Sequence, residues 1–353
     1  MGAWQRRPRW VGPTLNFALS IALGVLFTWL AMREVDFSKV GEYLGTVDYW
    51  LVIPYLAIAL VIHLVRTWRW GMLLAPVAHV PFRRMLAVSS VGFMAIVLLP
   101  FRMGEFVRPY LVTERGKISF SAAFGTCVVE RVIDGLLFCG MLFVALALVD
   151  VPVPSGVVTS GYVALSFWGG LLAVLVLALW KRDASLRFWR RALGLVSQRL
   201  AEKLTGMLAA FIDGLHALRE VRRIAGVVGL SVVYWLLSGI STWVLLQAFH
   251  FDLPLTAAFV LIGILVIGIM VPGGPGFAGP FEVAVYVALV QLFGLGLDEN
   301  ASFTIVYHGL MFTFQLVVGV IFLFSSHVSF FKVVSDSGRA AGSLQGEESP
   351  PSS

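Results

Sequence analysis

Six apolar runs, each long enough to cross a bilayer, constrain this chain more than any other feature of its sequence. A helix needs about 20 apolar residues to span the hydrocarbon core. Such runs occupy residues 14–32, 49–65, 120–149, 156–180, 226–249 and 301–326. Charged residues make up 13% of the 353-residue chain, against about 25% in soluble domains, so lipid must be the solvent for much of its surface. The sequence therefore predicts an all-α, multi-pass membrane protein and excludes a soluble fold.

The two ends of the chain are polar. Arg6, Arg7 and Arg9 precede the first apolar run, as they would in a secretory signal peptide. A signal has an apolar region of about 7–15 residues that ends in small residues. This run is longer and ends in Met32-Arg33, so we interpret it as the first span. Residues 334–353 are small and polar and predict a disordered cytoplasmic tail.

Two further apolar segments, 85–101 and 255–293, are interrupted by Pro, Gly and charged residues. Lys and Arg concentrate in cytoplasmic loops. With the N-terminus inside, all the main basic clusters lie on one side only if 85–117 enters and leaves by the same face. The flanks of 255–293 are poor in positive charge, which favours entry from the outside. We predict six full spans and two opposed re-entrant hairpins in an inverted-repeat-like core, with eight ordinary spans as the alternative.

The predicted location is the inner, cytoplasmic membrane, with both termini cytoplasmic. The integral membrane domain covers residues 1–333, and its one sizeable polar region, 181–225, alternates apolar and basic residues with a helical period. Such helices lie at an anionic membrane surface, which explains the net charge of +6 without nucleic acid. Residues 36–48 predict a short external interfacial helix. Trp68, flanked by Arg66 and Arg69, fits an interfacial anchor.

Charged residues inside a predicted span are candidates for function, because each costs at least about 2.5–3.5 kcal/mol at the bilayer centre. Glu130 and Asp134 share one helix face, and Arg131 can pair with Asp134. An intramembrane salt bridge that only locks helix packing is an equal alternative for Arg131 and Asp134. Glu130 lacks an equally obvious local partner, so the pattern favours a functional role for it.

The first interrupted segment reads LLPFRMGEFVRPYL. Pro100 breaks helical hydrogen bonding and Gly104 supplies a hinge at the turn. Broken backbone is tolerated at membrane depth only where protein or a watery cavity satisfies it. Arg102, Glu105 and Arg108 would line such a cavity, and the planar guanidinium suits phosphate. For Arg108 a plain cytoplasmic loop is an equal alternative.

The second interrupted segment reads MVPGGPGFAGPFE. Gly273, Gly274 and Gly276 predict an unwound hinge before a half-helix that carries Glu282, whose alternative role is to cap that helix. Two such segments entering from opposite faces are the best sequence pointer to a transporter's binding site. His308 in the last span could face the same cavity, although a lone helical His is more often a packing residue.

No motif for other chemistry is present. The two cysteines, Cys127 and Cys139, form no CxxC, and the histidines lack metal-ligand spacing. The formal G-x-G-x-x-G match at 274–279 lies between apolar segments rather than in a βαβ unit, so we interpret it as accidental. No P-loop, HExxH or Ser-His-Asp arrangement occurs. We therefore expect no metal, no cofactor and no enzymatic activity.

Taken in order, RTWRW, PFRMGEFVR, ERVID and PGGPGFAGPFE resemble the lysylphosphatidylglycerol synthase transmembrane family, the flippase-like domain of the multiple peptide resistance proteins. The resemblance covers about residues 14–326. It implies functional positions at Arg102, Gly104, Glu105, Arg108, Glu130, Arg131, Asp134, Gly273, Gly274, Gly276 and Glu282. The family often has Tyr-Arg where this chain has Tyr307-His308, a change that removes a permanent positive charge.

In larger members, this domain is thought to move an aminoacylated phospholipid between leaflets while a separate soluble domain charges that lipid. No such domain follows the last span here, so aminoacyl transfer is not implied. The resemblance implies a lipid translocase acting on membrane lipids; the alternatives are a membrane-embedded transferase or accessory subunit for a lipid carrier or glycolipid, and a scaffold. Expected partners are a lipid-modifying enzyme and a second copy of the chain.

Overall fold

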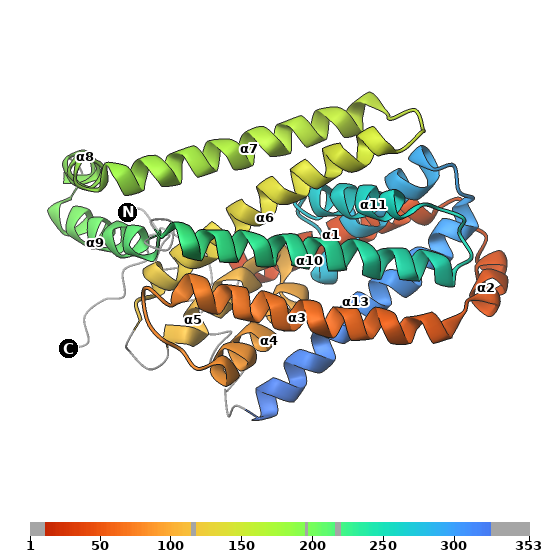
Figure 1. Ribbon diagram of the computed structural model, residues 1–353, viewed down its shortest axis with the longest axis horizontal. Coiled ribbons are helices and arrows are strands. Elements are labelled where there is room, and N and C mark those ends of the chain that lie inside the picture. The colour runs from red at the N-terminus through yellow and green to blue at the C-terminus, as the bar shows by residue number, and fades with distance from the viewer. Residues whose placement is uncertain (1–10, 114–117, 195–196, 216–219, 326–353) are drawn as a thin grey trace, which may run out of the picture.

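The computed structural model describes residues 11–113, 118–194, 197–215 and 220–325, and in these residues all regular structure is helical (Figure 1). Six long helices run along the long axis of the molecule: α1 (Val11–Met32), α3 (Val52–Leu74), α6 (Phe120–Leu148), α7 (Ser155–Trp180), α10 (Val221–Ala248) and α13 (Leu297–Ser325). These helices correspond to the six predicted spans. The chain is a multi-pass, all-α membrane protein.

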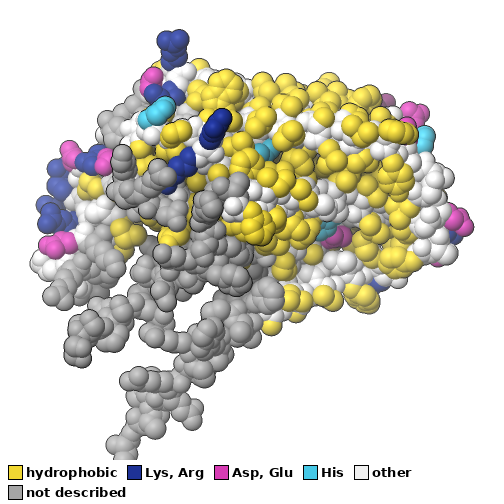
Figure 2. Space-filling model, turned by 90° about the horizontal axis from the view of Figure 1, so that it is seen from below, with side chains coloured by type: hydrophobic (Ala, Val, Ile, Leu, Met, Phe, Trp, Pro, Cys, Tyr) yellow, Lys and Arg dark blue, Asp and Glu magenta, His cyan; other side chains and the backbone are white. Residues whose placement is uncertain are grey.

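Charged side chains gather at the two ends of the molecule, and apolar side chains cover the surface between them (Figure 2). We call the end with α8 (Arg182–Gly194) and α9 (Gln198–Gly214) the basic end. The opposite end, at α2 (Phe37–Thr46), is the acidic end. Apart from Arg33 and Lys39, its described charged residues are Glu34, Asp36, Glu42, Asp48, Asp150, Asp252, Asp298 and Glu299. Such segregation matches the charge distribution that the sequence predicts.

The first hairpin comprises α4 (Phe82–Leu98), the 3-10 turn η2 (Pro100–Phe106) and α5 (Val107–Thr113). A Cβ at Gly104 would overlap the backbone of Ala95 and Ile96, and one at Gly92 would overlap the side chain of Arg108. The returning arm thus lies antiparallel against α4. The chain reverses inside the molecule and leaves again at the basic end.

The second hairpin comprises α11 (Leu255–Gly268), the turn η4 (Pro275–Phe277), α12 (Pro280–Tyr286) and the π-helical turn η5 (Val287–Leu292). Gly268 packs against Ala284 and Gly273 packs against Pro280, so these arms are also antiparallel, and both ends lie at the acidic end (Figure 1). Length and composition alone count Pro275–Leu292 among six candidate spans in the described residues, with Ala18–Met32 and Phe37–Thr46 as a bent seventh. Its packing identifies Pro275–Leu292 as one arm of this hairpin.

The tips of the two hairpins meet near the middle of the molecule. Arg102 of η2 lies with its guanidinium carbon 5.7 Å from the ring centroid of Phe277 in η4. Leu99, Met270 and Gly274 line a small cavity of about 90 Å³ between the tips. Six spans with two opposed hairpins, rather than eight ordinary spans, is therefore the arrangement in the structure.

The start of the chain packs against its last third. Ser20 of α1 donates a hydrogen bond of 2.7 Å from its hydroxyl to the carbonyl of Gly273, and Gly24 lies against Gly274. Just beyond α1, the backbone N–H of Asp36 donates to Asp298 Oδ1 at 2.8 Å. Segments more than 250 residues apart in the sequence are therefore joined by direct hydrogen bonds.

Short helices cover both ends. At the acidic end, α2 is the predicted interfacial helix, followed by the turn η1 (Tyr49–Leu51). The hydroxyl and backbone N–H of Ser38 hold the pKa of Asp36, the N-cap of α2, below its ordinary value. At the basic end, α8 and α9 fall within the predicted amphipathic region 181–225, and Ile212 of α9 is buried. The predicted tail 334–353 and the cluster Arg6–Arg9 lie outside the described residues.

The apolar core is divided along the long axis. One cluster in the basic half is built around Trp70, Leu111 and Ile212. A second cluster in the acidic half is built around Phe281 and Phe303. The hairpin tips lie at the level where these two clusters meet, and polar residues concentrate there.

Candidate functional site

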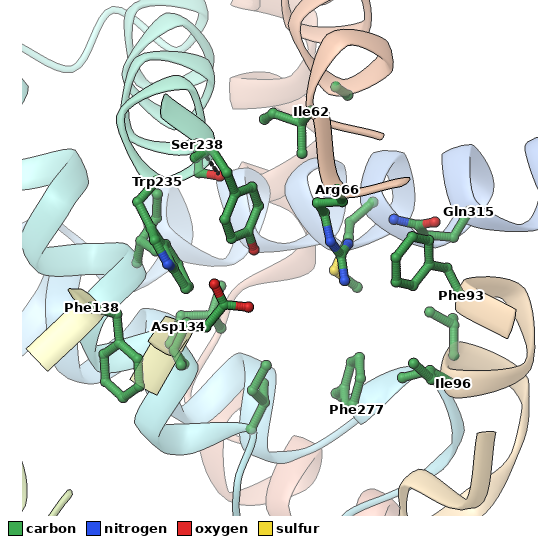
Figure 3. Close-up of a pocket in the computed structure, with 18 of the residues that line it drawn as sticks. Ile62, Arg66, Phe93, Ile96, Asp134, Phe138, Trp235, Ser238, Phe277 and Gln315 are labelled. Atoms are coloured by element: carbon green, nitrogen blue, oxygen red, sulfur yellow. Dashed lines mark hydrogen bonds between the residues drawn. The ribbon is translucent and has the colours of Figure 1, made fainter. Parts of the chain in front are cut away.

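A cavity of about 480 Å³ occupies the centre of the molecule beside the hairpin tips. Its walls come from α3, α4, α6, α7, α10, α11 and α13, and the two tips add Arg102, Glu105 and Phe277. Figure 3 shows Arg66 and Asp134 pointing toward the same open space, with Phe277 across from Arg66. Three of the predicted site residues on η2 and α6, Arg102, Glu105 and Arg131, also line it.

Glu130 is the centre of the charge network behind the cavity wall. Its side chain is fully buried and accepts hydrogen bonds from three arginines: Arg69 at 3.0 Å, Arg108 at 3.0 and 3.3 Å, and Arg131 at 2.5 Å. A buried charge is tolerable when it is paired and hydrogen-bonded. The sequence suggested no obvious partner for Glu130, because two of the three partners come from α3 and α5.

Asp134 forms the cavity side of the same network. Arg69 donates to both of its carboxylate oxygens, at 2.5 and 2.8 Å, in the bidentate geometry that makes such pairs strong. Arg131 lies 3.5 Å away, as the predicted spacing allows. A further hydrogen bond of 2.8 Å joins Arg69 to Ser231 of α10. The network thus ties α3, α5, α6 and α10 together.

Arg102 and Glu105 pair with each other at the tip of the first hairpin, at 2.9 Å. Both side chains are partly exposed, with exposed fractions of 32% and 24%. Arg102 has φ of 58°, a left-handed conformation that is uncommon for a residue other than glycine. The tip therefore presents one cation and one anion to the cavity from a strained turn. Arg108, by contrast, is buried and lies 4.3 Å from the ring centroid of Trp70.

Arg66 contacts aromatic rings instead of acids. Its guanidinium carbon lies 3.8 Å from the ring centroid of Phe93 and 5.5 Å from that of Tyr234. Among the described residues, no carboxylate lies within 4 Å of it, and its Nε has no hydrogen-bond partner. The interpretation of Arg66 and Arg69 as an interfacial anchor is wrong, because Arg69 is fully buried and Arg66 lines the central cavity.

The sequence did contain a signal for these two arginines. Trp70, Leu73 and Leu74 follow them and continue the apolar helix, so α3 extends nine residues beyond the predicted end at 65. Arg66 and Arg69 thus lie within a span. Trp68, which is 59% exposed, faces outward as expected for an anchor.

The polar groups around the cavity do not balance. Those that line it or contact a lining residue are the guanidinium groups of Arg66, Arg69, Arg102, Arg108 and Arg131 and the carboxylates of Glu105, Glu130 and Asp134. Five positive and three negative groups give a net charge of +2 in the described residues. The Nε atoms of Arg66 and Arg102 and the indole nitrogens of Trp168 and Trp235 also lack hydrogen-bond partners there. Such a site favours a ligand with negative charge and acceptor oxygens.

Glu282 and His308 lie together but do not line this cavity. Glu282 accepts a hydrogen bond of 2.6 Å from the backbone N–H of Gly279, which makes it the predicted cap of α12, and it pairs with His308 at 2.7 Å. Of the predicted hinge glycines, Gly276 has φ of 71°, and Gly273 and Gly274 pack against α12 and α1. Pro100 begins η2. No group of three or more potential metal ligands occurs in the described residues.

Comparison with known proteins gives one family and two relatives. A sequence model described as the lysylphosphatidylglycerol synthase TM region matches residues 17–319. Glycosyltransferase AglD of Haloferax volcanii is 27% identical over 96% of this chain, but this chain spans only 60% of its length. A UPF0104 membrane protein of Methanothermobacter thermautotrophicus is 25% identical over 86% of this chain and 93% of its own length. No solved structure is significantly similar.

Proposed function

Because the chain belongs to the lysylphosphatidylglycerol synthase TM region family, we propose that it moves a phosphate-bearing polar lipid between the leaflets of the membrane. The cavity beside the hairpin tips receives the headgroup. The acyl chains stay outside among the apolar faces of the helices. No covalent step is part of this proposal, and the protein acts without nucleotide.

The excess of positive charge in the central cavity is the observation that carries the proposal. A net charge of +2 surrounded by helices of a membrane protein is expensive unless a ligand supplies the counter-charge. A phosphate group brings negative charge and several acceptor oxygens, and guanidinium groups bind it with paired hydrogen bonds. Arg66 is the strongest candidate for this contact because no carboxylate lies within ion-pair distance of it in the described residues.

The other charges have supporting roles in this mechanism. Asp134 and Glu130 hold Arg69 and Arg131 in place by short ion pairs, so the cavity wall keeps its shape when the headgroup leaves. Arg102 and Glu105 sit on a hairpin tip and can exchange their mutual pair for contacts with the headgroup. Translocation then requires the two tips to move past the headgroup, one after the other, as the two halves of the molecule rock about the cavity.

A reconstitution assay tests this function. Purified protein in liposomes is given fluorescent phosphatidylglycerol, phosphatidylcholine or a phosphate-free glycolipid, and the rate of transfer between leaflets is measured. We expect transfer of the phospholipids, and a loss of about tenfold or more in Arg66→Gln, because a hydrogen bond to a charged group contributes about 1.5–3 kcal/mol. Arg187→Gln, a matched change on α8 at the basic end, should leave the rate unchanged.

The outcome that counts against translocation is equally specific. Transfer rates equal to those of protein-free liposomes for all three lipids would refute the function. If the wild type and Arg66→Gln raise the transfer rate equally above that of protein-free liposomes, translocation is supported and the proposed role of Arg66 in binding phosphate is refuted.

The relation to glycosyltransferase AglD favours a second candidate function, in transfer to or from a lipid-linked sugar. In that case Glu105, which lines the cavity, would act as a base. Mass spectrometry of purified protein incubated with a sugar donor and a polyprenyl phosphate would detect the product. Product that forms in the wild type and is lost in Glu105→Gln would favour this alternative over translocation.

A further inference from the structure

A second polar site lies at the tip of the second hairpin, apart from the central cavity. His308 of α13 places Nδ1 2.7 Å from Glu282 Oε1 of α12, and Nε2 2.7 Å from the carbonyl oxygen of Gly276 in η4. The imidazole ring stacks on Phe281, with centroids 4.3 Å apart and planes inclined by 18°. Only 16% of the His308 side chain is exposed. The ring is thus held at both nitrogens and on one face.

The two short contacts of His308 need two hydrogens. Both partners, a carboxylate oxygen and a carbonyl oxygen, are acceptors, and a neutral imidazole carries one N–H. A neutral His308 beside an ionised Glu282 would leave two lone pairs facing each other across 2.7 Å. One more proton resolves this, whether it resides on His308 as imidazolium or on Glu282 as a carboxylic acid. The geometry therefore corresponds to a pair that has bound one proton.

We propose that His308 and Glu282 form a proton-binding site, and that the bound proton fastens the tip of the second hairpin to α13. When the proton leaves to water, either the His308–Gly276 or the His308–Glu282 hydrogen bond is lost. The lone pairs that remain then repel each other. The tip is released as pH rises and fastened as pH falls.

The backbone of the tip is strained and would relax on release. Phe277 has φ of 67°, a left-handed value that a bulky side chain rarely adopts, and Gly276 and Gly279 have φ of 71° and 96°. Phe277 lines the central cavity and carries Arg102 of the first hairpin over its ring. Gly276, which accepts the hydrogen bond from His308, and Phe277, which lines the cavity, are adjacent in the chain. Loss of the proton at His308 therefore shifts Phe277 and changes its contact with Arg102 of the first hairpin.

Among the described residues, Glu282 is the acid that contacts His308. From α1, the tip is met by Ser20 and Gly24, which carry no charge. Lys39 of α2 pairs with Asp298, which lies ten residues before His308 on α13. The other charged or titratable groups near this part of α13 are Tyr286 on α12, Tyr55, His63 and Arg66 on α3, Tyr234 on α10, Tyr307 on α13, and Arg102 and Glu105 on η2, which pair with each other.

Hydrogen–deuterium exchange measures the fastening without any transport. The full-length protein in lipid nanodiscs is compared at pD of about 5 and about 9, which bracket the range where imidazoles titrate. Rates for peptides covering 272–282 are divided by the intrinsic rate at each pD. We expect the wild type to be protected at the lower value and to exchange about tenfold faster or more at the higher one, as loss of one charge-assisted hydrogen bond predicts.

Three variants make the exchange result specific. His308→Gln, whose amide has donors at one atom only, should exchange fast at both values, and His308→Arg, with a permanent charge and several donors, should stay protected at both. His79→Gln changes an exposed histidine of the α3–α4 loop and should match the wild type. Equal wild-type protection at both values, or full protection of His308→Gln at the lower value, overturns the proton site.

The consequence for transport rests on the proposed function and has its own readout. In the liposome assay, the wild-type transfer rate should change about tenfold or more between acid and alkaline buffer, and that of His308→Gln should not change. A pH-dependent tip with a pH-independent transfer rate would refute proton coupling while the proton site stands. Absence of transfer at every pH would refute the proposed function, and the exchange experiment would still decide the site.

Discussion

Arg66 and Arg69 lie one helical turn apart on α3 and differ in a way that stability measurements can detect. Arg69 makes two hydrogen bonds to Asp134, one to Glu130 and one to Ser231. Removing one partner of a buried ion pair costs about 3–5 kcal/mol, because the remaining charge loses its compensation. We expect Arg69→Gln to lower the free energy of unfolding by this amount.

Arg66→Gln should behave differently. It removes a cation that has no carboxylate partner within the described residues, so no buried carboxylate loses its ion-pair partner. The interaction of Arg66 with Phe93 contributes about 2 kcal/mol when desolvated, and the desolvation of the unpaired charge offsets it. The net change in the free energy of unfolding should stay within about 1 kcal/mol of zero, since two opposing terms of similar size cancel.

Titration of the purified protein from mild detergent into sodium dodecyl sulfate, followed by circular dichroism, measures both variants. The expected difference between them is about 3 kcal/mol or more, the lower bound for a broken buried pair. Equal losses in the two variants would refute the reasoning, since they would mean that Arg66 is held by a partner as Arg69 is. A loss that occurs only in Arg66→Gln would contradict the described ion pairs directly.

Three further predictions concern the hairpins and the ends of the molecule. Gly104→Val should lower the free energy of unfolding by about 1–3 kcal/mol or more, as overpacking does, because the added Cβ meets the backbone of Ala95 and Ile96. Gly41→Ala is the control, because a Cβ there meets nothing within 4 Å. Equal effects of the two changes in a thermal melt would contradict the close approach at Gly104. Hydrogen bonds from Ser38 lower the pKa of Asp36, so the carboxylate that caps α2 is present above that pKa and is lost as pH falls through it. Amide exchange in α2, divided by the intrinsic rate at each pH, should therefore rise in acid, and a ratio that does not change with pH would count against the cap. A cysteine at position 79 and one at position 42 should react with an impermeant maleimide from opposite sides of the membrane, in a background without Cys127 and Cys139; labelling from one side would exclude the predicted orientation.

The sequence predicted the spans and hairpins because those features depend on local composition. A run of about 20 apolar residues, and a Pro/Gly break within such a run, can be seen in one stretch of chain. Charge at the flanks then set the direction of each hairpin, and the antiparallel contacts of Gly104 and Gly268 agree with it. The ends of α3 and α10 were placed less well, since Arg residues near a span's end look like a boundary whether or not the helix continues.

The pairing of charges could not be predicted, because it depends on contacts between distant segments. Glu130 receives Arg69 from 61 positions earlier and Arg108 from 22 positions earlier. Local spacing offered only Arg131, and that contact is present. For the same reason, the separation of Glu282 and His308 from the cavity could not be predicted. Residue types alone suggested one site for all the charged groups, whereas the packing of the second hairpin's tip divides them between two sites.

The contacts between α1 and the second hairpin have a consequence for biosynthesis. The hydroxyl of Ser20 cannot form its hydrogen bond until Gly273 has been synthesised, 253 residues later. At about 5–20 residues per second this interval is on the order of 10–50 s. Through that time the first helix must be inserted with a polar hydroxyl and a glycine surface that the second hairpin does not yet cover. An insertase or chaperone that covers the Ser20 and Gly24 surface of α1 would therefore act early on this protein, and a chain truncated before residue 273 would leave the Ser20 hydroxyl without its acceptor, the carbonyl of Gly273.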